Sequence, residues 1–530
     1  MPVNAHGATS ALNALRRERE LEALVASDDA VDVVIIGGGI TGVGLALDAI
    51  TRGLSTVLVE KHDLAFGTSR WSSKLAHGGL RYLAKMELGI AHHSAVERGI
   101  IMECTAPHLV RALPQVMALG DDSTLVQKAA TRVGFLAGDA LRITAGTSAD
   151  TLPRSRYASR EETLRLCPAV ARTKMRGAWV NYDGQMVDDA RMVTAIARTA
   201  AREGARILTY CEATRASGDE VTLRDRLAGR ELTVRARAVI SAAGVWAGGL
   251  DPDIKVRPAR GTHLVFRAES LGNPTGALTV PLPGSVSRYL FILPAPHGRC
   301  YLGLTDEDAP GEIPDVPPTP EEDVDFLLRN INRALDRKLT RDDVVGAFTG
   351  LRPLLDSGQG GSTADLSRRH AVVASRDGMF SVVGGKFTEY RLMAEETLDR
   401  VIEDRGLRAG ECVTRNFPLV GAPGHRDYSH IAVRDLHGLP EAMIRRFGNE
   451  APRVVEAATV ERPLDTVGSL DVTRAEVEYA FTHEGAVTVE DVLERRTRAA
   501  MVPEDAQEMR PEVSEIRERV MRMMGVEENA

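Results

Sequence analysis

The chain lacks several features on which secreted, membrane-spanning and metal-binding proteins depend. Its cysteines are few and scattered over the 530 residues, at Cys104, Cys167, Cys211, Cys300 and Cys412. No two of them form a C-x-x-C pair, which excludes the usual zinc and iron–sulfur spacings, so we expect no bound metal. Scattered cysteines also fit reduced thiols in a cytoplasm. No apolar run reaches the roughly 18 to 20 residues that a membrane-spanning helix needs. A charged run at residues 16–20 stands where a signal peptide would have its apolar core, so we expect neither secretion nor a membrane span.

The composition is otherwise that of an ordinary soluble globular protein, with 43% hydrophobic and 26% charged residues. Aromatic residues are scarce at 4%, and the net charge is −8. This acidic balance argues against broad nucleic-acid binding, although a local basic pocket for an anionic substrate stays open. At 530 residues the chain is too long for one compact core, so we expect two or three domains.

A glycine-rich loop follows the first apolar strand, which we expect at residues 33–36. Its residues are Gly37, Gly39, Ile40, Thr41 and Gly42, followed by a predicted helix to residue 52 and a second strand at 56–59 that ends on the acid Glu60. The first glycine permits a tight turn, the second lets a pyrophosphate approach the backbone, and the third lets the helix pack against the strand. The acid would accept hydrogen bonds from ribose hydroxyls. This complete context favours dinucleotide binding over an ordinary glycine turn.

Two later segments favour FAD over a nicotinamide nucleotide. An apolar strand at 239–243 runs into Gly244 and Trp246, and a strand at 380–383 runs into Gly385 and Lys386 before another helix. A second helix N-terminus directed at a flavin ring would stabilise the negative charge of the reduced flavin. Either segment alone could be ordinary α/β packing, but together with the first motif they indicate FAD.

Several longer stretches carry a family resemblance. They are S-S-K-L-x-H-G-G-L-R-Y at 72–82, V-D-D-A-R at 187–191, G-L-T-D at 303–306, G-L-R-P-L at 350–354, G-G-K-F-T-E-Y-R at 384–391, and A-V-T-V-E-D-V-L with R-R-T-R at 486–498. On these residues the chain resembles the FAD-dependent, respiratory glycerol-3-phosphate dehydrogenases, within the wider glycine oxidase and D-amino-acid oxidase group. The resemblance covers about residues 31 to 500, and the block at 72–82 is its most specific part.

The resemblance implies an α/β fold of three parts. These are an FAD-binding Rossmann-like domain, an antiparallel-sheet substrate domain of the D-amino-acid and glycine oxidase type, and a C-terminal helical domain. We expect a leader at 1–30, containing one helix at about 10–25. The oxidoreductase region would occupy 31–420, with its substrate-binding parts mainly at 80–185 and 255–350, and the helical domain 421–530.

A phosphate ester needs several cations, preferably arginines that bind it through two hydrogen bonds. The resemblance implies that the phosphate and carbinol of glycerol 3-phosphate are bound by five residues: Arg81, Tyr82, Arg352, Arg368 and Lys386. The alternative is that these cations are ordinary solvated surface residues. That alternative is weakest for Arg352, which lies in an apolar setting. Arg369 or His370 could take the place of Arg368 in the family alignment.

Oxidation of a secondary alcohol by flavin requires loss of the hydroxyl proton and hydride transfer to flavin N5, here giving dihydroxyacetone phosphate. His77 is our candidate for the base, because histidine has a suitable pKa; a histidine that only hydrogen-bonds the flavin is the alternative. Arg352 and Lys386 would stabilise the developing alkoxide. Two hypotheses compete with this one: an FAD-dependent amino-acid or amine oxidase of the same fold, and a non-enzymatic flavin-binding or tRNA-modification partner.

The expected FAD-binding set combines the glycine loop, the specific block and the two later segments. It comprises Gly37, Gly39, Ile40, Thr41, Gly42, Glu60, Lys61, Thr68, Ser69, Ser73, Lys74, Leu75, His77, Gly78, Gly79, Gly244, Trp246, Gly385, Lys386, Phe387 and Thr388.

The resemblance implies a membrane quinone as electron acceptor and a peripheral position on the cytoplasmic membrane face. Two segments could supply an amphipathic basic surface, residues 511–524 and 442–447. In the first, apolar residues fall near one face at Val513, Ile516, Val520 and Met523. Ordinary helix packing is the alternative for both. Oxygen, as in the related glycerol-3-phosphate oxidases, is the alternative acceptor, and a homodimer stays open.

Overall fold

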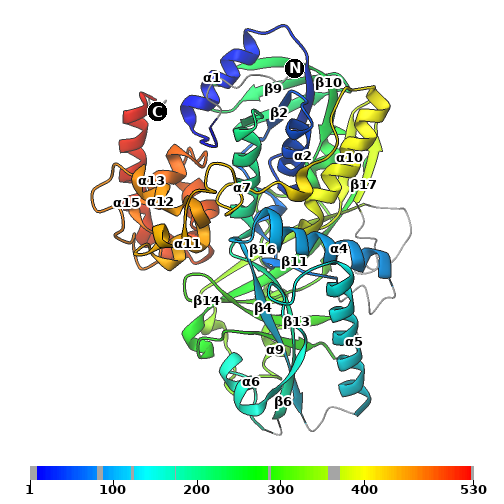
Figure 1. Ribbon diagram of the computed structural model, residues 1–530, viewed down its shortest axis with the longest axis vertical. Helices are drawn as coiled ribbons and strands as arrows, with labels where there is room; N and C mark the ends of the chain where they lie inside the picture. Colours follow the sequence, from blue (N-terminus) through cyan, green and yellow to red (C-terminus); the bar gives the residue numbers. More distant parts are fainter. Residues whose placement is uncertain are drawn as a thin grey trace.

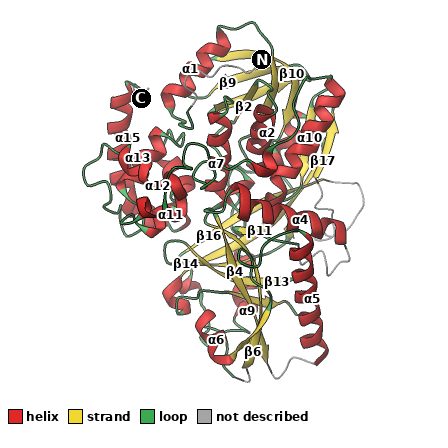
Figure 2. Ribbon diagram, in the orientation of Figure 1, coloured by secondary structure: helices red, strands yellow, loops and turns green. Residues whose placement is uncertain are grey.

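The computed structural model describes residues 9–79, 87–120, 125–173, 175–283, 288–355 and 370–526, with the backbone alone at 120 and 125–131. Two sheets lie along the longest axis of the molecule, the first near the top and the second near the bottom of Figure 1. Helices from the C-terminal part of the chain pack at one side of the first sheet. Figure 2 separates these strand-rich regions from the helical one by colour.

The first sheet holds the predicted nucleotide-binding unit. Its strand order is β17-β18-β10-β1-β2-β7, and β8 and β9 extend it as a hairpin beside β10. The strands are β1 (Val31–Ile36), β2 (Thr56–Val59), β7 (Arg206–Leu208), β8 (Cys211–Ala216), β9 (Glu220–Asp225), β10 (Glu231–Ser241), β17 (His370–Ala374) and β18 (Phe380–Gly384). β1 pairs in parallel with both β2 and β10, so the predicted parallel βαβ unit is confirmed. β2 and most of β1 are buried, as parallel strands covered on both faces should be.

Helices cover both faces of this sheet. On one face lie α2 (Ile40–Thr51), α7 (Asp189–Arg202) and α10 (Tyr390–Arg405), whose apolar side chains share one core with β1. On the other face α1 (Ala14–Val25) packs Leu21 and Leu24 against Val34 and Val57. The helix expected in the leader therefore exists, although it begins only at Ala14. It covers one face of the sheet, which the sequence alone did not indicate.

The second sheet is the expected antiparallel one. Its order is β15-β11-β14-β13-β12-β4-β6-β3, with β16 beside β11 and β5 beside β6; among its described strands, only β12 and β4 pair in parallel. The strands are β3 (Leu75–Ala76), β4 (Val110–Gly120), β5 (Arg156–Ser159), β6 (Met175–Met186), β11 (Val256–Arg267), β12 (Ala277–Pro281), β13 (Tyr289–Ala295), β14 (Arg299–Gly303), β15 (Glu307–Asp308) and β16 (Gly346–Leu355). Its associated helices are α4 (Leu88–Ile100), α5 (Leu125–Thr144), α6 (Arg160–Leu166) and α9 (Glu321–Ile331).

The C-terminal region is helical, as expected. Its helices are α11 (Glu441–Phe447), α12 (Ala451–Glu456), α13 (Arg474–Thr482), α14 (Val489–Asp491) and α15 (Pro503–Met524), and α8 (Ala247–Leu250) lies in the first domain. Single turns of 3₁₀ or π type occur at η1 (Thr68–Arg70), η2 (Ile101–Thr105), η3 (Gly244–Trp246), η4 (Ala268–Leu271), η5 (Arg341–Asp343), η7 (Phe387–Glu389), η8 (Thr414–Asn416), η9 (Val433–Leu436), η10 (Gly448–Glu450), η11 (Val492–Arg496) and η12 (Ala499–Met501).

The two helices that were candidates for an amphipathic membrane surface pack their apolar side chains inside the C-terminal helical region. In α15, Val513, Ile516 and Val520 are buried in the core of the helical region, and only Met523 is exposed. In α11, Met443 and Phe447 are likewise buried, and the partly buried Ile444 packs against the same core. Both apolar faces are therefore taken up by the protein itself, and the alternative of ordinary packing holds. Among the described residues, no helix is both long and apolar enough to cross a membrane.

Candidate active site

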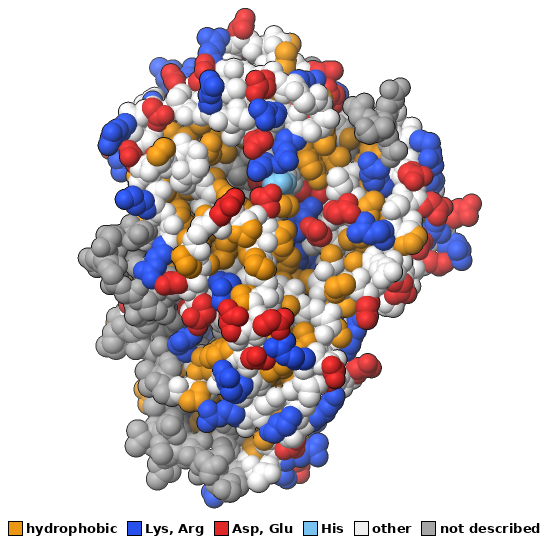
Figure 3. Space-filling model, turned by 180° about the vertical axis from the view of Figure 1, so that it is seen from behind, with side chains coloured by type: hydrophobic (Ala, Val, Ile, Leu, Met, Phe, Trp, Pro, Cys, Tyr) orange, Lys and Arg blue, Asp and Glu red, His pale blue; other side chains and the backbone are white. Residues whose placement is uncertain are grey.

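A cavity of about 1670 Å³ lies between the two sheets. Its lining comes from the β1–α2 loop, the segment after β2, η3 and the β18–η7 turn on one side, and from β4, β11, β12, β13 and β16 on the other. It exceeds the roughly 300–1,000 Å³ of an ordinary ligand pocket, so it can hold a dinucleotide together with a substrate. Figure 3 shows hydrophobic side chains gathered across the middle of the rear face, at the level where the two sheet regions meet.

The glycine loop has the geometry of a phosphate cradle. Gly37 has φ +114°, a conformation that suits glycine, and a Cβ on Gly42 would lie 1.8 Å from the Gly37 oxygen. Gly39, Ile40 and Thr41 line the cavity. The N-cap of α2 is Gly39, which has no side chain to bond the first helical N–H groups. This helix N-terminus is therefore oriented to hold an anion.

Glu60 lines the cavity at the end of β2 and holds the loop in place. Its carboxylate accepts hydrogen bonds from the backbone N–H groups of Gly38 at 2.6 Å and His62 at 2.8 Å. Burial raises its pKa, and these two N–H groups oppose that rise. Each carboxylate oxygen has more than one lone pair, so the predicted ribose contact remains compatible with this task.

The segment that follows Glu60 forms a continuous part of the lining. Lys61, Thr68, Ser69, Ser73 and Leu75 all line the cavity. The Ser69 hydroxyl accepts from the Ile40 N–H at 2.9 Å, and the Thr68 hydroxyl donates to the Leu351 carbonyl at 2.6 Å. The segment is thus tied both to the glycine loop and to the second sheet.

Four of the predicted cofactor residues do not line this cavity. The Lys74 ammonium donates to the carbonyls of Arg70 and Ser72 and lies 3.0 Å from Asp189, so its side chain belongs to the scaffold behind the lining. Gly42, Gly78 and Gly79 act through close packing. A Cβ on Gly78 would lie 2.1 Å from the Arg98 guanidinium, and one on Gly79 would lie 2.9 Å from Ala91.

The later segments predicted to contact the flavin also line this cavity. Gly385 has φ +83°, and Lys386, Phe387 and Thr388 follow it along the lining into η7. Gly244 and Trp246 line the cavity from η3. A Cβ on Gly67 would lie 2.8 Å from the Trp246 ring, so this ring and the segment after Glu60 meet at close range.

The three predicted catalytic residues are brought to the same cavity. His77, Arg352 and Lys386 all line it, although they lie on the first part of the chain, on β16 and before η7. The Arg352 guanidinium bonds Asp306 at 3.0 Å, and the Lys386 ammonium donates to Ser94 at 2.9 Å and Glu389 at 2.8 Å. The other predicted substrate contacts, Arg81, Tyr82 and Arg368, lie outside the described residues.

Comparisons with known proteins agree with this geometry. A family model described as FAD dependent oxidoreductase matches residues 32–391, and one described as C-terminal domain of alpha-glycerophosphate oxidase matches 412–524. Glycerol-3-phosphate dehydrogenase 1 of Mycobacterium tuberculosis is 56% identical over 501 residues, which are 94% of this chain and 96% of that protein. A mitochondrial glycerol-3-phosphate dehydrogenase of Arabidopsis thaliana is 33% identical, over 92% of this chain and 83% of that one.

Among solved structures, glycerol-3-phosphate dehydrogenase from Bacillus halodurans complexed with FAD has a TM-score of 0.73 and 25% identity. The match covers 97% of this chain and 94% of that one. The chain belongs to the FAD-dependent glycerol-3-phosphate dehydrogenase family.

FAD is the cofactor of this family member, and the residues present fit it. The glycine cradle offers a place for a pyrophosphate that any larger side chain at Gly37 or Gly42 would disturb. Two buried donors in the lining, Asn181 Nδ2 and Trp71 Nε1, have no hydrogen-bond partner within the part of the chain that the structure describes. Buried donors of this kind usually bind a ligand or water.

One lining residue escaped the sequence analysis. His263 on β11 is buried, stacks on Phe348 with ring centroids 4.7 Å apart, and contacts the Ser73 hydroxyl at 2.9 Å. Burial, with Lys74 and Arg352 nearby, holds its pKa well below the usual value, so the ring is neutral. The available signal was a histidine directly before the apolar run at 264–266, two residues after a glycine. That glycine, Gly261, leaves space for the Arg352 guanidinium.

Proposed function

We propose that the protein oxidises sn-glycerol 3-phosphate to dihydroxyacetone phosphate and passes the electrons to a membrane quinone. When bound, FAD supplies the acceptor for the hydride that leaves carbon 2 of the substrate. The observation that carries the proposal is the meeting of His77, Arg352 and Lys386 in the cavity that contains the glycine loop. The names of the relatives support the same substrate.

Each side chain has a distinct task in this proposal. Arg352, oriented by Asp306, binds the phosphate through its planar guanidinium. Lys386 is held by Ser94 and Glu389, and its ammonium stabilises negative charge on the carbinol oxygen as the proton leaves. His77 accepts that proton. We add Arg81, Tyr82 and Arg368 as further contacts of the phosphate and carbinol.

The decisive experiment is anaerobic reduction of the bound flavin. Without an acceptor, one equivalent of glycerol 3-phosphate should bleach the visible absorbance of the holoprotein, whereas glycerol should bleach it only very slowly and amino acids should not bleach it. An amino-acid oxidase of the same fold would need one arginine for a carboxylate and no second cation. Bleaching by an amino acid, or none by glycerol 3-phosphate, would overturn the proposed substrate.

An apolar part of the cavity supports a quinone as acceptor. Beyond the predicted catalytic residues the lining includes Leu88 of α4, Met117 of β4 and Val133 of α5. The side chains of Leu88 and Val133 are also 57% and 64% exposed, so the lining continues to the surface. There α4 and α5 lie on the same side of the molecule (Figure 1).

The exposed face of α5 extends this apolar surface. Leu136 and Ile143, seven residues apart on one helix face, are 48% and 59% exposed. An apolar acceptor dissolved in a lipid layer could reach the cavity across such a face, which supports a peripheral position on a membrane; the cytoplasmic side is what the family resemblance implies. Oxygen would need no such surface and remains the alternative acceptor.

Charging this face should weaken membrane binding. We expect Leu136→Glu with Ile143→Glu to reduce cosedimentation with lipid vesicles by at least about tenfold, because each burial of a large apolar side chain contributes about 1.5–3 kcal/mol. Reduction of a long-chain quinone in vesicles should fall in parallel, while activity with a water-soluble quinone stays unchanged.

The matched control is Val316→Glu with Val433→Glu, which charges exposed apolar residues elsewhere on the surface. It should leave vesicle binding intact. Equal behaviour of the two double variants would reject α5 as the membrane surface. Rapid peroxide formation in air, together with no reduction of either quinone, would instead identify an oxidase.

A further inference from the structure

The segment from Glu60 to His77 supplies much of the cavity lining, yet it contains little regular structure. Only η1 and β3 interrupt it. Its inner side includes Phe66, Thr68, Ser69 and Trp71, which all line the cavity. A segment of this kind needs outside contacts to keep one conformation.

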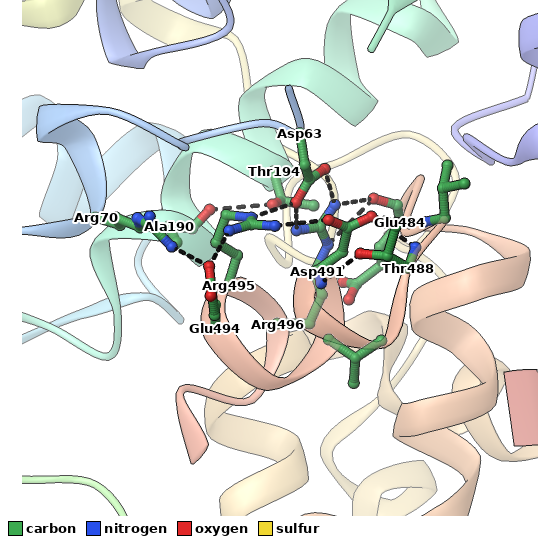
Figure 4. A network of polar contacts seen from close by, with 12 residues as sticks. Asp63, Arg70, Ala190, Thr194, Glu484, Thr488, Asp491, Glu494, Arg495 and Arg496 are labelled. Atoms are coloured by element: carbon green, nitrogen blue, oxygen red, sulfur yellow. Dashed lines mark hydrogen bonds and ion pairs between the residues drawn. The ribbon is translucent and has the colours of Figure 1, made fainter. Parts of the chain in front are cut away.

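Those contacts come from the C-terminal helical region. Asp63, a fully buried residue, accepts hydrogen bonds from Arg495 at 2.7 Å and from both terminal nitrogens of Arg496 at 2.8 Å. Arg495 also donates to Asp491 at 2.6 Å. Figure 4 shows this network, with Asp63 above the turn that carries both arginines. Burial raises the pKa of Asp63, but Arg496 and Arg495 outweigh it, so the net pKa is lowered and the carboxylate stays charged.

A second attachment lies seven residues further along the segment. The buried Arg70 donates to Glu494 at 2.5 Å, and Arg498 donates to the Arg70 carbonyl at 2.5 Å. Burial and the neighbouring Arg495 lower the pKa of Arg70 to about 10, which leaves it a cation at neutral pH. The same Glu494 also accepts from Arg495 at 2.5 Å, so the two attachments share one acid (Figure 4).

The arginines of this network also contact the aromatic rings of the lining. The Arg70 guanidinium lies 4.8 Å from the Phe66 ring and 4.4 Å from the Trp71 ring. Arg495 lies 5.6 Å from Phe66, and Arg498 lies 5.4 Å from Trp71. Cation–π contacts at these distances fix ring positions as well as adding stability. A shift of the arginines would therefore move two rings of the cavity.

We propose that residues 491–498 are a positioning element for FAD: by holding Asp63 and Arg70 they preset the lining segment that begins at Glu60, the predicted ribose-binding acid. The lining segment is then already ordered when FAD binds, so the free energy of FAD binding is not reduced by the entropy cost of ordering it. Asp491, Glu494, Arg495, Arg496 and Arg498 act through the segment and are positioning residues. The C-terminal helical region thus contributes to cofactor retention without lining the cofactor site.

The test compares two buried carboxylates that each join two arginines. Asp63→Asn breaks the proposed element, whereas Asp505→Asn breaks the matched contact of Asp505 with Arg267 and Arg299 on the second sheet. Removing one member of a buried ionic group destabilises a protein, so both variants should lose thermal stability. FAD affinity of the apoprotein, measured by flavin fluorescence at a temperature where both are folded, should separate them.

We expect Asp63→Asn to raise the Kd for FAD by at least tenfold and Asp505→Asn to change it by less than twofold. Saturating FAD should restore the turnover of Asp63→Asn with an unchanged KM for substrate. An equal rise in Kd in both variants would reduce residues 491–498 to a structural role. An unchanged Kd in Asp63→Asn would overturn the proposal outright.

A milder pair keeps the proposal testable if Asp63→Asn does not fold. Glu494→Gln weakens the contact with Arg70 and Arg495, whereas Glu490→Gln removes an exposed partner of Arg510 nearby. We expect about a threefold rise in the Kd for FAD in Glu494→Gln and none in Glu490→Gln. Equal values in these two variants would again contradict the proposal.

Discussion

Replacement of Arg352 by alanine should lower kcat/KM for glycerol 3-phosphate by about 10³-fold and leave FAD bound. Truncating one partner of a hydrogen-bonded charge pair in a desolvated site costs about 2–5 kcal/mol, and a loss of about 4 kcal/mol corresponds to this factor. The lost contact is with the phosphate, and the variant also leaves the largely buried Asp306 without its bond to the guanidinium. Arg352→Lys should recover only part of the activity, because an ammonium cannot form the paired contact.

Two comparisons identify this loss as a phosphate effect. Arg257→Ala removes an arginine of β11 that pairs with Asp308, away from the cavity lining, and should change kcat/KM little. Weak turnover of glycerol, which has no phosphate, should be nearly equal in the parent protein and in Arg352→Ala. A proportional loss with glycerol would show that Arg352 acts on the carbinol, and full activity with glycerol 3-phosphate would remove it from the site.

The nucleotide half of the site could be predicted from the sequence because its information is local. The loop Gly37–Gly42 and the acid Glu60 lie within one βαβ unit, and each glycine has its own steric requirement. The close approach of Gly42 to the Gly37 oxygen follows directly from that spacing. The antiparallel second sheet was expected as well, but from the family resemblance and not from a local motif.

Contacts between distant parts of the chain could not be predicted in this way. Arg495 and Asp63 are 432 residues apart, and nothing near either residue indicates the other. The sequence R-R-T-R at 495–498 therefore contributed to the family resemblance but did not predict that these arginines bind Asp63 and Arg70. The ammonium of Lys74 shows the same limit, since its direction depends on Asp189.

Amphipathic periodicity has a related limit. The pattern of Val513, Ile516 and Val520 shows that one face of a helix is apolar, but it does not show what covers that face. In the structure the cover is the core of the helical region. Exposed apolar residues lie on α5 instead, among them Leu136 and Ile143, and their spacing alone does not show that this face is left uncovered.

Two histidines in the cavity compete for the role of base, and their surroundings differ. His263 is buried against Phe348 and has its pKa held well below the usual value, by burial first and then by Lys74 and Arg352. Accepting a proton there would place a third positive charge beside two others. His77 lines the cavity and is only partly buried, so the substrate can reach its ring. This difference favours His77.

His77→Ala should therefore keep FAD and lose turnover by about 10²- to 10⁴-fold, the usual contribution of a positioned base. The rate of anaerobic flavin bleaching isolates the chemical step, and its dependence on pH should lose the limb that reports the base. His263→Gln, which retains a group able to bond Ser73, should lose less than about tenfold. The reverse pattern would assign the proton to His263. Near-normal turnover of both variants would mean that proton loss is not limiting, because a base is needed only where the proton leaves in the rate-determining transition state.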